Sequence, residues 1–188
     1  SYNPDLPGWL LRQTEAHTSV LINGGGHIYH QGEEGTNKSL AYAHVIAHQV
    51  GLDWMTTTSD VTEAYRLAGH PVNRVTRTLV LLKPDVLAVF DAVDLEAPST
   101  VEVRFQAFNR DGKGDVVAEN QGFRIKRPHA GLVAVVGGVQ PTGESPASIR
   151  WSASDGQWLI EGERNGQPFE VRLVERANHG APAVTVLS

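Results

Sequence analysis

The chain contains no cysteine among its 188 residues. This absence excludes disulfide bonds, thiolate metal ligands and cysteine nucleophiles together. No apolar run approaches the roughly 18 residues that a membrane-spanning helix needs. Positive charge does not dominate either, because the formal net charge is -5. A nucleic-acid binder needs a basic face that neutralises phosphates, so we expect no nucleic-acid partner and no membrane span.

Glycine and proline are frequent, at 19 and 10 residues, and valine is prominent among the 40% of residues that are hydrophobic. This balance favours short strands joined by tight turns over packed helices. We therefore predict an all-β fold: a large antiparallel β-sandwich of about a dozen strands, with few or no helices. At this length the strands fit one domain over residues 1–188.

The expected strands are short runs of apolar and β-branched residues bounded by turn signals. An Asn-Gly pair at Asn165 and Gly166 is a strong hairpin signal between two of them. The glycines that follow Ile22 predict a tight reversal after the first strand. The runs lie at 20–22, 75–82, 86–93, 100–108, 122–127, 132–137, 157–163, 168–174 and 183–187.

The segment 40–50 is ambiguous, because its alanines suit a helix while its alternation suits a strand. We favour a strand, since the β-branched run 54–58 continues the pattern. A regular strand would place Tyr42, His44, Ile46 and His48 on one face. Asp60 then predicts a short helical or bulged turn that begins at its carboxylate.

Three blocks of the sequence occur in the order and at the spacing of three motifs known from one protein family. The first block runs from Gln13 to Gly26 and includes the sequence Ala16-His17-Thr18-Ser19-Val20. The second is 59–65, with Asp60, Thr62 and Tyr65, and the third is 72–93, with Arg74, Arg77 and Asp91. Together they resemble the heparinase II/III-like domain of polysaccharide lyases, in which the first block reads Q-T-x-A-H-N-[TS]-V. The alginate and oligoalginate lyase branch is the most similar. Thr18 stands where that family usually has asparagine.

The resemblance implies cleavage of a uronic-acid-containing polysaccharide by β-elimination. A base removes the proton at C5 of the uronate and an acid assists the departing glycosidic oxygen. Other groups neutralise the substrate carboxylate. In this family most of these groups belong to an amino-terminal helical toroid, while the β domain contributes residues at the edge of the active site and, in several members, part of a structural zinc site.

The same resemblance assigns roles to four residues. His17 would be a zinc ligand or an imidazole at the active-site edge, with further zinc ligands upstream, so no filled zinc site is expected in this chain alone. Tyr2, fifteen residues earlier, would be a general acid or a substrate contact. Arg74 and Arg77 would bind the anionic substrate, although their odd spacing puts them on opposite faces of a strand. An ion pair of either arginine with Asp60, Asp85 or Asp91 is the open alternative, and Asp91 itself suggests a hydrogen-bonding residue.

Two other patterns have simpler explanations. His27 and His30, like His44 and His48, have spacings that suggest metal ligands, but on strands neither pair converges on one ion, so surface histidines are the better interpretation. The glycines 24–26 lack a following lysine and helix, so they do not form a phosphate-binding loop.

We carry three hypotheses for function. The first is the carboxy-terminal β domain of a polysaccharide lyase, periplasmic or secreted, that acts on an anionic polysaccharide with an upstream helical domain of the same protein. The second is a non-catalytic carbohydrate-binding module of a secreted protein, and the third is a structural β domain. The chain begins at Ser1 without methionine and without a signal-peptide pattern, so we expect it to be a piece of a longer protein.

Overall fold

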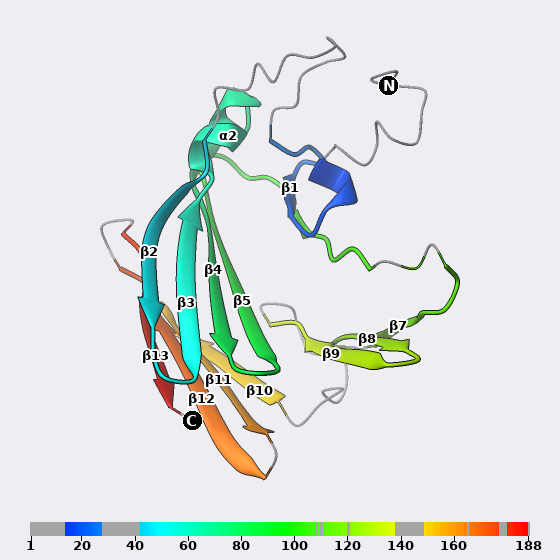
Figure 1. Ribbon diagram of the computed structural model, residues 1–188. Helices are drawn as coiled ribbons and strands as arrows, with labels where there is room; N and C mark the ends of the chain where they lie inside the picture. Colours follow the sequence, from blue (N-terminus) through cyan, green and yellow to red (C-terminus); the bar gives the residue numbers. More distant parts are fainter. Residues whose placement is uncertain are drawn as a thin grey trace. The chain divides into compact units, whose positions relative to one another are not determined.

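The structure is a computed structural model, and it describes residues 14–27, 42–107, 109, 111–119, 121–137, 149–164, 166–176 and 180–187. Within these residues the chain is mostly β, with thirteen strands, one α-helix and one 3-10 helix (Figure 1). All strand pairs are antiparallel. The predicted mostly-β fold with antiparallel sheets is therefore confirmed, whereas the stacking of the sheets into one sandwich stays a prediction.

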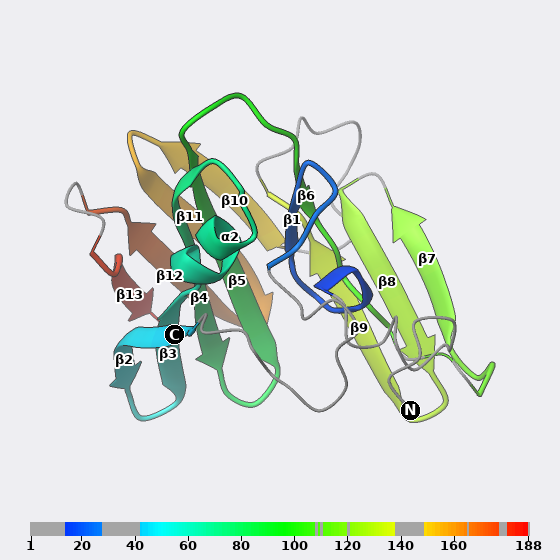
Figure 2. The same cartoon turned by 90° about the horizontal axis from the view of Figure 1, so that it is seen from above.

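The chain divides into two compact units, residues 1–106 and 107–188. In the first unit, the sheet β2-β3-β4-β5 is joined by a two-stranded sheet of β1 and β6. Figure 2 shows β1 and β6 side by side. The elements of this unit are η1 (Thr14–Ala16), β1 (Val20–Ile22), β2 (His44–Val50), β3 (Trp54–Asp60), α2 (Thr62–Leu67), β4 (Val72–Leu82), β5 (Val86–Leu95) and β6 (Val101–Val103).

The core of the first unit lies where β1 meets α2, β4 and β5. Val20 and Ile22 of β1 pack with Tyr65 of α2 and with Val72 and Val75 of β4, and all five are buried. Val20 and Ile22, two residues apart along β1, share the face that joins this cluster, and Leu21 between them is buried on the other face. Burial of this face holds the segment around β1 against the sheet.

The helix α2 is the short helical turn predicted after Asp60. Asp60 Oδ1 accepts a hydrogen bond from the backbone N–H of Thr62, at 2.8 Å. The N-cap position itself belongs to Val61, so Asp60 acts one residue earlier than a capping side chain. The helix ends at Leu67, and Gly69 then adopts a positive φ of 80°, which glycine tolerates without strain.

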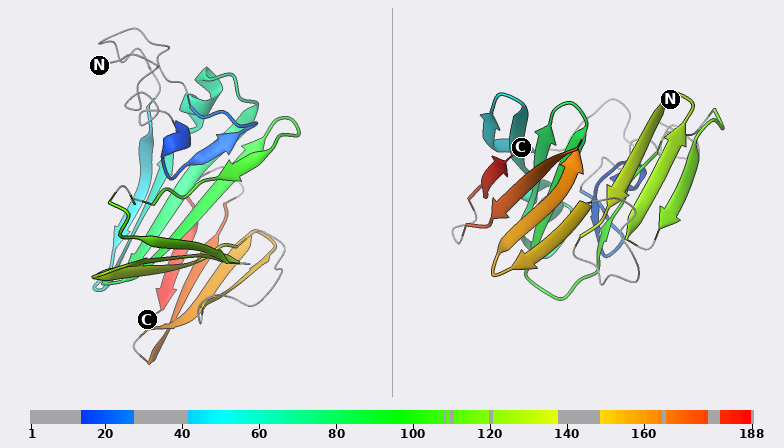
Figure 3. Two further views of the ribbon diagram at one scale, coloured as in Figure 1. Left: turned by 90° about the vertical axis from the view of Figure 1, so that its right-hand side faces the viewer. Right: turned by 90° about the horizontal axis from the view of Figure 1, so that it is seen from below.

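The second unit contains a three-stranded sheet, β7-β8-β9, and a four-stranded sheet, β10-β11-β12-β13 (Figure 3). In β12, Phe169, Val171 and Leu173 alternate with exposed or half-buried residues and form its buried face. The strands of this unit are β7 (Asp115–Glu119), β8 (Gly122–Arg127), β9 (Ala130–Val135), β10 (Ile149–Ser154), β11 (Gln157–Arg164), β12 (Gln167–Val174) and β13 (Ala183–Leu187).

One prediction about β2 is wrong. The segment is a strand, as favoured, but its register with β3 shifts between Val45 and Ala47. His44 pairs with Asp60 and His48 with Thr57, so the two histidines lie on opposite faces of the sheet. A β-bulge adds one residue to a strand, and one extra residue reverses the alternation of side chains.

The run expected at 100–108 forms a strand only over Val101–Val103, and residue 108 lies outside the described residues. The ladder is short because β6 pairs with β1, which offers only three residues of its own. The strands β7 and β10 were not predicted. Their sequences contain charged residues and serines at positions where the prediction required apolar ones.

Candidate functional site

The candidate site is built around the segment 17–20, which leads from η1 into β1. The backbone N–H of His17 donates to the carbonyl of Thr14, at 3.1 Å, so His17 closes the 3-10 turn. Ser19 then exchanges both backbone hydrogen bonds with Arg104, at 3.2 and 2.9 Å. The side chain of His17 itself is exposed. The fold therefore presents this imidazole at the surface while it fixes the backbone on both sides of it.

Side chains next to His17 add to this fixation. The hydroxyl of Ser19 donates to the carbonyl of Thr14, at 2.7 Å. The hydroxyl of Thr18 accepts a hydrogen bond from the backbone N–H of Gln106, at 3.1 Å. Threonine thus performs a local hydrogen-bonding role at the position where the similar family carries asparagine.

Arg77 connects the same segment to the large sheet. Its Nε and Nη2 donate to the two carboxylate oxygens of Asp91, at 2.7 and 2.9 Å, and its Nη1 donates to the carbonyl of Thr18, at 2.7 Å. Arg77 and Asp91 face each other across β4 and β5. The hydrogen bond to Asp91 raises the pKa of Arg77. For Arg77, the ion pair with Asp91 that was open from the sequence is observed.

Tyr65 holds the segment from a second direction. Its hydroxyl donates to the carbonyl of Val20, at 2.5 Å, and the residue is 2% exposed. Burial raises the pKa of Tyr65 to about 12, with a smaller opposing effect from Arg77 and a further increase from Asp91. A phenol with such a pKa stays protonated at neutral pH, so it serves as a hydrogen-bond donor here.

The glycines after β1 allow two close approaches. Asn23 and Gly24 form the turn, with positive φ angles of 51° and 78°. A Cβ on Gly26 would lie 2.1 Å from Cβ of Thr14, and one on Gly25 would lie 2.9 Å from Cε1 of His70. His70 donates from Nε2 to the carbonyl of Gly26, at 2.8 Å. The reversal therefore needs residues that tolerate positive φ at positions 23 and 24. At positions 25 and 26 it needs residues without a side chain.

The sequence-predicted site residues are not all brought together. Arg77 reaches the residue next to His17, whereas Arg74 lies on the opposite face of β4, as the odd spacing predicted. Tyr2 and His30 lie outside the described residues. Sequence reasoning missed the roles of Tyr65 and His70. The signal for Tyr65 was its place in the second matching block, but nothing in that block indicated the carbonyl that it contacts.

The zinc site predicted at His17 would need several ligands close together. Within the described ranges there is no group of three or more histidine, cysteine, aspartate or glutamate side chains that could hold a metal ion. Structural zinc sites in proteins are usually tetrahedral with four ligands. The described residues therefore do not complete a zinc site at His17 by themselves.

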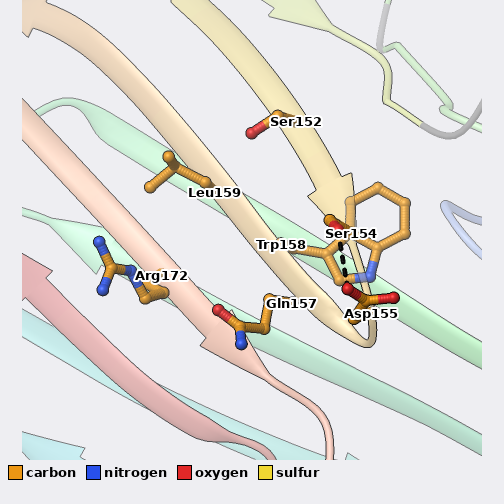
Figure 4. A pocket seen from close by; sticks show the side chains of 7 residues that line it. All are labelled: Ser152, Ser154, Asp155, Gln157, Trp158, Leu159 and Arg172. Atoms are coloured by element: carbon orange, nitrogen blue, oxygen red, sulfur yellow. Dashed lines mark hydrogen bonds between the residues drawn. The ribbon is translucent and has the colours of Figure 1, made fainter.

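The second unit carries a separate feature, a shallow hollow of about 350 Å³ on the sheet of β10, β11 and β12 (Figure 4). Register places Ser152 opposite Leu159 and Leu159 opposite Arg172, so these three share one face. Arg172 also pairs with Glu170, at 2.9 Å. The lining combines hydroxyls, a carboxylate, an amide, a guanidinium and an indole: Ser152, Ser154, Asp155, Gln157, Trp158, Leu159 and Arg172.

The described residues contain no helix that is long and apolar enough to cross a membrane.

Antiparallel sheets, an exposed His17 ahead of β1 and an arginine-carboxylate pair bonded to the carbonyl of the next residue define a β-rich chain with an anchored histidine segment. A comparison with protein families identifies the family of the chain. The family model described as "Heparinase II/III-like, C-terminal" matches residues 8–181, and the chain therefore belongs to this family. The match extends over both units. No curated protein matches the chain.

Proposed function

We propose that the chain is the carboxy-terminal β domain of an enzyme that cleaves uronic-acid-containing polysaccharide by β-elimination, and that His17 lies at the edge of its active site. Membership of the heparinase II/III-like family supports the reaction class. A periplasmic or secreted location is part of the same proposal, because a polymeric substrate lies outside the cytoplasm.

The observation that carries the proposal is the environment of His17. Its side chain is exposed, yet the adjacent backbone is held by Thr14, Arg104 and Arg77. A histidine needed only for packing would be buried or bonded through its ring. Catalytic and substrate-contacting groups, in contrast, must be accessible and held in a fixed position.

In the proposed elimination, this domain and an upstream helical domain of the same protein each supply part of the active site. A base from the helical domain would remove the C5 proton, and Tyr2 would protonate the leaving oxygen or contact the substrate. An imidazole at His17 would donate a hydrogen bond to the substrate carboxylate and so stabilise the charge that develops on it. The substrate role of Arg74 stays a prediction, and it concerns the face of β4 opposite to Arg77.

The test uses the full-length protein with alginate, heparin and other uronate polymers. Elimination creates an unsaturated uronate, which is followed by its ultraviolet absorbance. We expect His17→Gln to lower the rate by about 100-fold or more, in the range typical for loss of a positioned acid-base or hydrogen-bonding group. His129→Gln, an exposed histidine between β8 and β9, is the matched control and should leave the rate unchanged. Absence of elimination on every uronate polymer would refute the proposed reaction.

Zinc ligation is the alternative role that we propose for His17, which would then be one ligand of a zinc ion in the full-length protein. The metal content of the purified full-length protein tests it, since His17→Gln should then lower the zinc content below that of the unmodified protein. An equal zinc content in both would exclude His17 as a ligand.

A second candidate function is a carbohydrate-binding module without chemistry of its own. The hollow on β10, β11 and β12 favours it, because hydroxyl, amide and guanidinium groups around Ser152, Gln157 and Arg172 suit the hydroxyl groups of a sugar. Affinity electrophoresis of this chain in gels that contain polysaccharide is the test. Retardation that Gln157→Ala abolishes, with no elimination by the full-length protein, would favour the module over the lyase.

A further inference from the structure

We propose that Arg77 is a positioning residue: it fixes the segment that carries His17 against β4 and β5 and does not itself bind the substrate carboxylate. The structural part of this inference concerns only the described residues. Its catalytic consequence rests on the proposed lyase function.

The first argument is that each of the three guanidinium nitrogens of Arg77 already donates a hydrogen bond within the protein. Two nitrogens of its guanidinium form a bidentate pair with Asp91 and the third donates to Thr18. A guanidinium recognises a substrate carboxylate best through two parallel N–H groups, and in Arg77 that edge is occupied by Asp91. The positive charge of Arg77 is balanced by the same carboxylate. Binding a uronate in this way would require Asp91 to be displaced.

The second argument comes from the two edges of β1. Because Ser19 exchanges backbone hydrogen bonds with Arg104, the carbonyls of Thr18 and Val20 point away from β6. Arg77 meets the first of these carbonyls, at 2.7 Å, and Tyr65 meets the second, at 2.5 Å. Two side chains therefore occupy the place that a second partner strand would take. They act on the segment 18–20, directly after His17.

The third argument is the burial of the anchoring groups. The side chains of Arg77 and Asp91 are 24% and 13% exposed, and Tyr65 is buried. Hydrogen bonds with charged groups in partly buried surroundings are stronger and more rigid than exposed ones. The Arg77–Asp91 pair is thus partly buried and the bond from Tyr65 is buried, while the bond from Arg77 to Thr18 and the imidazole of His17 lie at the surface.

The experiment separates positioning from substrate binding by kinetics. In the full-length protein, Arg77→Lys keeps the positive charge but loses the planar fork. We expect kcat to fall by about tenfold to 100-fold, the cost of a small misplacement of a catalytic group, with KM within about threefold of the unmodified value. A rise in KM with unchanged kcat would overturn the proposal, because it would indicate direct substrate binding. Asp91→Asn should reproduce the effect on kcat.

A second readout uses this chain and needs no activity. Backbone amide hydrogen exchange of residues 18–22 should become at least about tenfold faster in Arg77→Lys and in Asp91→Asn, while that of β11 and β12 stays unchanged. Arg124→Lys, which alters an exposed pair with Glu119, is the matched control and should change neither segment. Unchanged exchange at 18–22 in both variants would overturn the anchoring role even if the lyase function holds. Faster exchange in a protein without lyase activity would refute only the proposed function.

Discussion

Tyr65 combines a polar and an apolar role in one side chain. Its ring lies in the core of the first unit, with the ring of His27 at 5.8 Å in an edge-on arrangement and that of His70 at 5.7 Å. Its hydroxyl donates a hydrogen bond to the carbonyl of Val20. This carbonyl points away from β6. A buried carbonyl without a donor costs about 1–3 kcal/mol, so the hydroxyl contributes to stability by satisfying that group.

We predict that Tyr65→Phe lowers the free energy of unfolding by about 1–3 kcal/mol, because the ring remains and only the hydrogen bond is lost. Chemical denaturation at neutral pH measures the change. Tyr42→Phe, at a tyrosine that is 60% exposed, serves as control and should have no effect. A loss below about 0.3 kcal/mol for Tyr65→Phe would mean that water replaces the hydroxyl.

The raised pKa of Tyr65 adds a pH dependence with a defined sign. The pKa is about 12 in the folded chain against 10.0 for an unperturbed tyrosine, so the folded state binds the phenolic proton more tightly. Its contribution is complete below pH 10 and is lost as the pH rises from 10 towards 12. We predict that the unmodified chain loses stability across this interval more steeply than Tyr65→Phe. Parallel curves for the two proteins would contradict the shift.

At the scale of elements, a row of threonines distinguishes the middle of the large sheet. Thr56 and Thr58 of β3 and Thr76 and Thr78 of β4 are all buried. The hydroxyls of Thr58 and Thr78 lie 3.0 Å apart as a cross-strand hydrogen bond. The hydroxyl of Thr56 has no hydrogen-bond partner among the described residues. Two alternate positions on the same face of β3 thus differ in whether the buried hydroxyl has a hydrogen-bond partner.

We therefore predict opposite effects for two similar substitutions. Thr56→Val should raise the free energy of unfolding by about 1 kcal/mol, because a buried hydroxyl without a partner is replaced by a methyl group. Thr58→Val should lower it by about 1 kcal/mol, because the hydroxyl of Thr78 loses its partner. Urea denaturation of both variants measures the two changes. If both substitutions stabilise the chain equally, the Thr58–Thr78 hydrogen bond contributes nothing.

Strands with regular alternation were predictable from the sequence. The ion pair of Arg77 with Asp91 was one of the alternatives that the sequence left open. Residues 75–82 and 86–93 were expected as strands, and Arg77 and Asp91 lie seven residues on either side of Pro84 in the turn between them. Their pairing follows from hairpin geometry once the turn is placed. The bulge in β2 was not predictable in this way, because no glycine or proline marks it and the alternation of 42–48 looks unbroken. It reversed the expected relation of His44 and His48.

The contacts that fix His17 could not be inferred from the sequence for a different reason. They join residues that are 45 and 59 positions apart, as in the bonds from Tyr65 to Val20 and from Arg77 to Thr18. Local periodicity gives no information on such pairs. The resemblance to lyases indicated that His17 matters, but only the tertiary structure identifies the side chains that hold it.

At the scale of the whole molecule, the proposed reaction needs groups from two domains. This leads to a prediction for the present chain by itself. Without the helical domain that supplies the base, the chain should release no unsaturated uronate from alginate or heparin, even after prolonged incubation at high protein concentration. Ultraviolet absorbance measures this, with the full-length protein as the positive control. Detectable elimination by the chain alone would show that these 188 residues contain a complete catalytic set.

The bulge in β2 also affects how copies of the molecule meet one another. Among the described residues β2 is the outer strand of its sheet, and Val45 and Val50 are 65% and 70% exposed. A flat, apolar outer strand is a template onto which strands from other molecules add, as in fibrils. The extra residue between Val45 and Ala47 interrupts the row of N–H and C=O groups that such a strand would need. We therefore expect the irregularity that separates His44 from His48 to disfavour the addition of strands from other molecules at this edge.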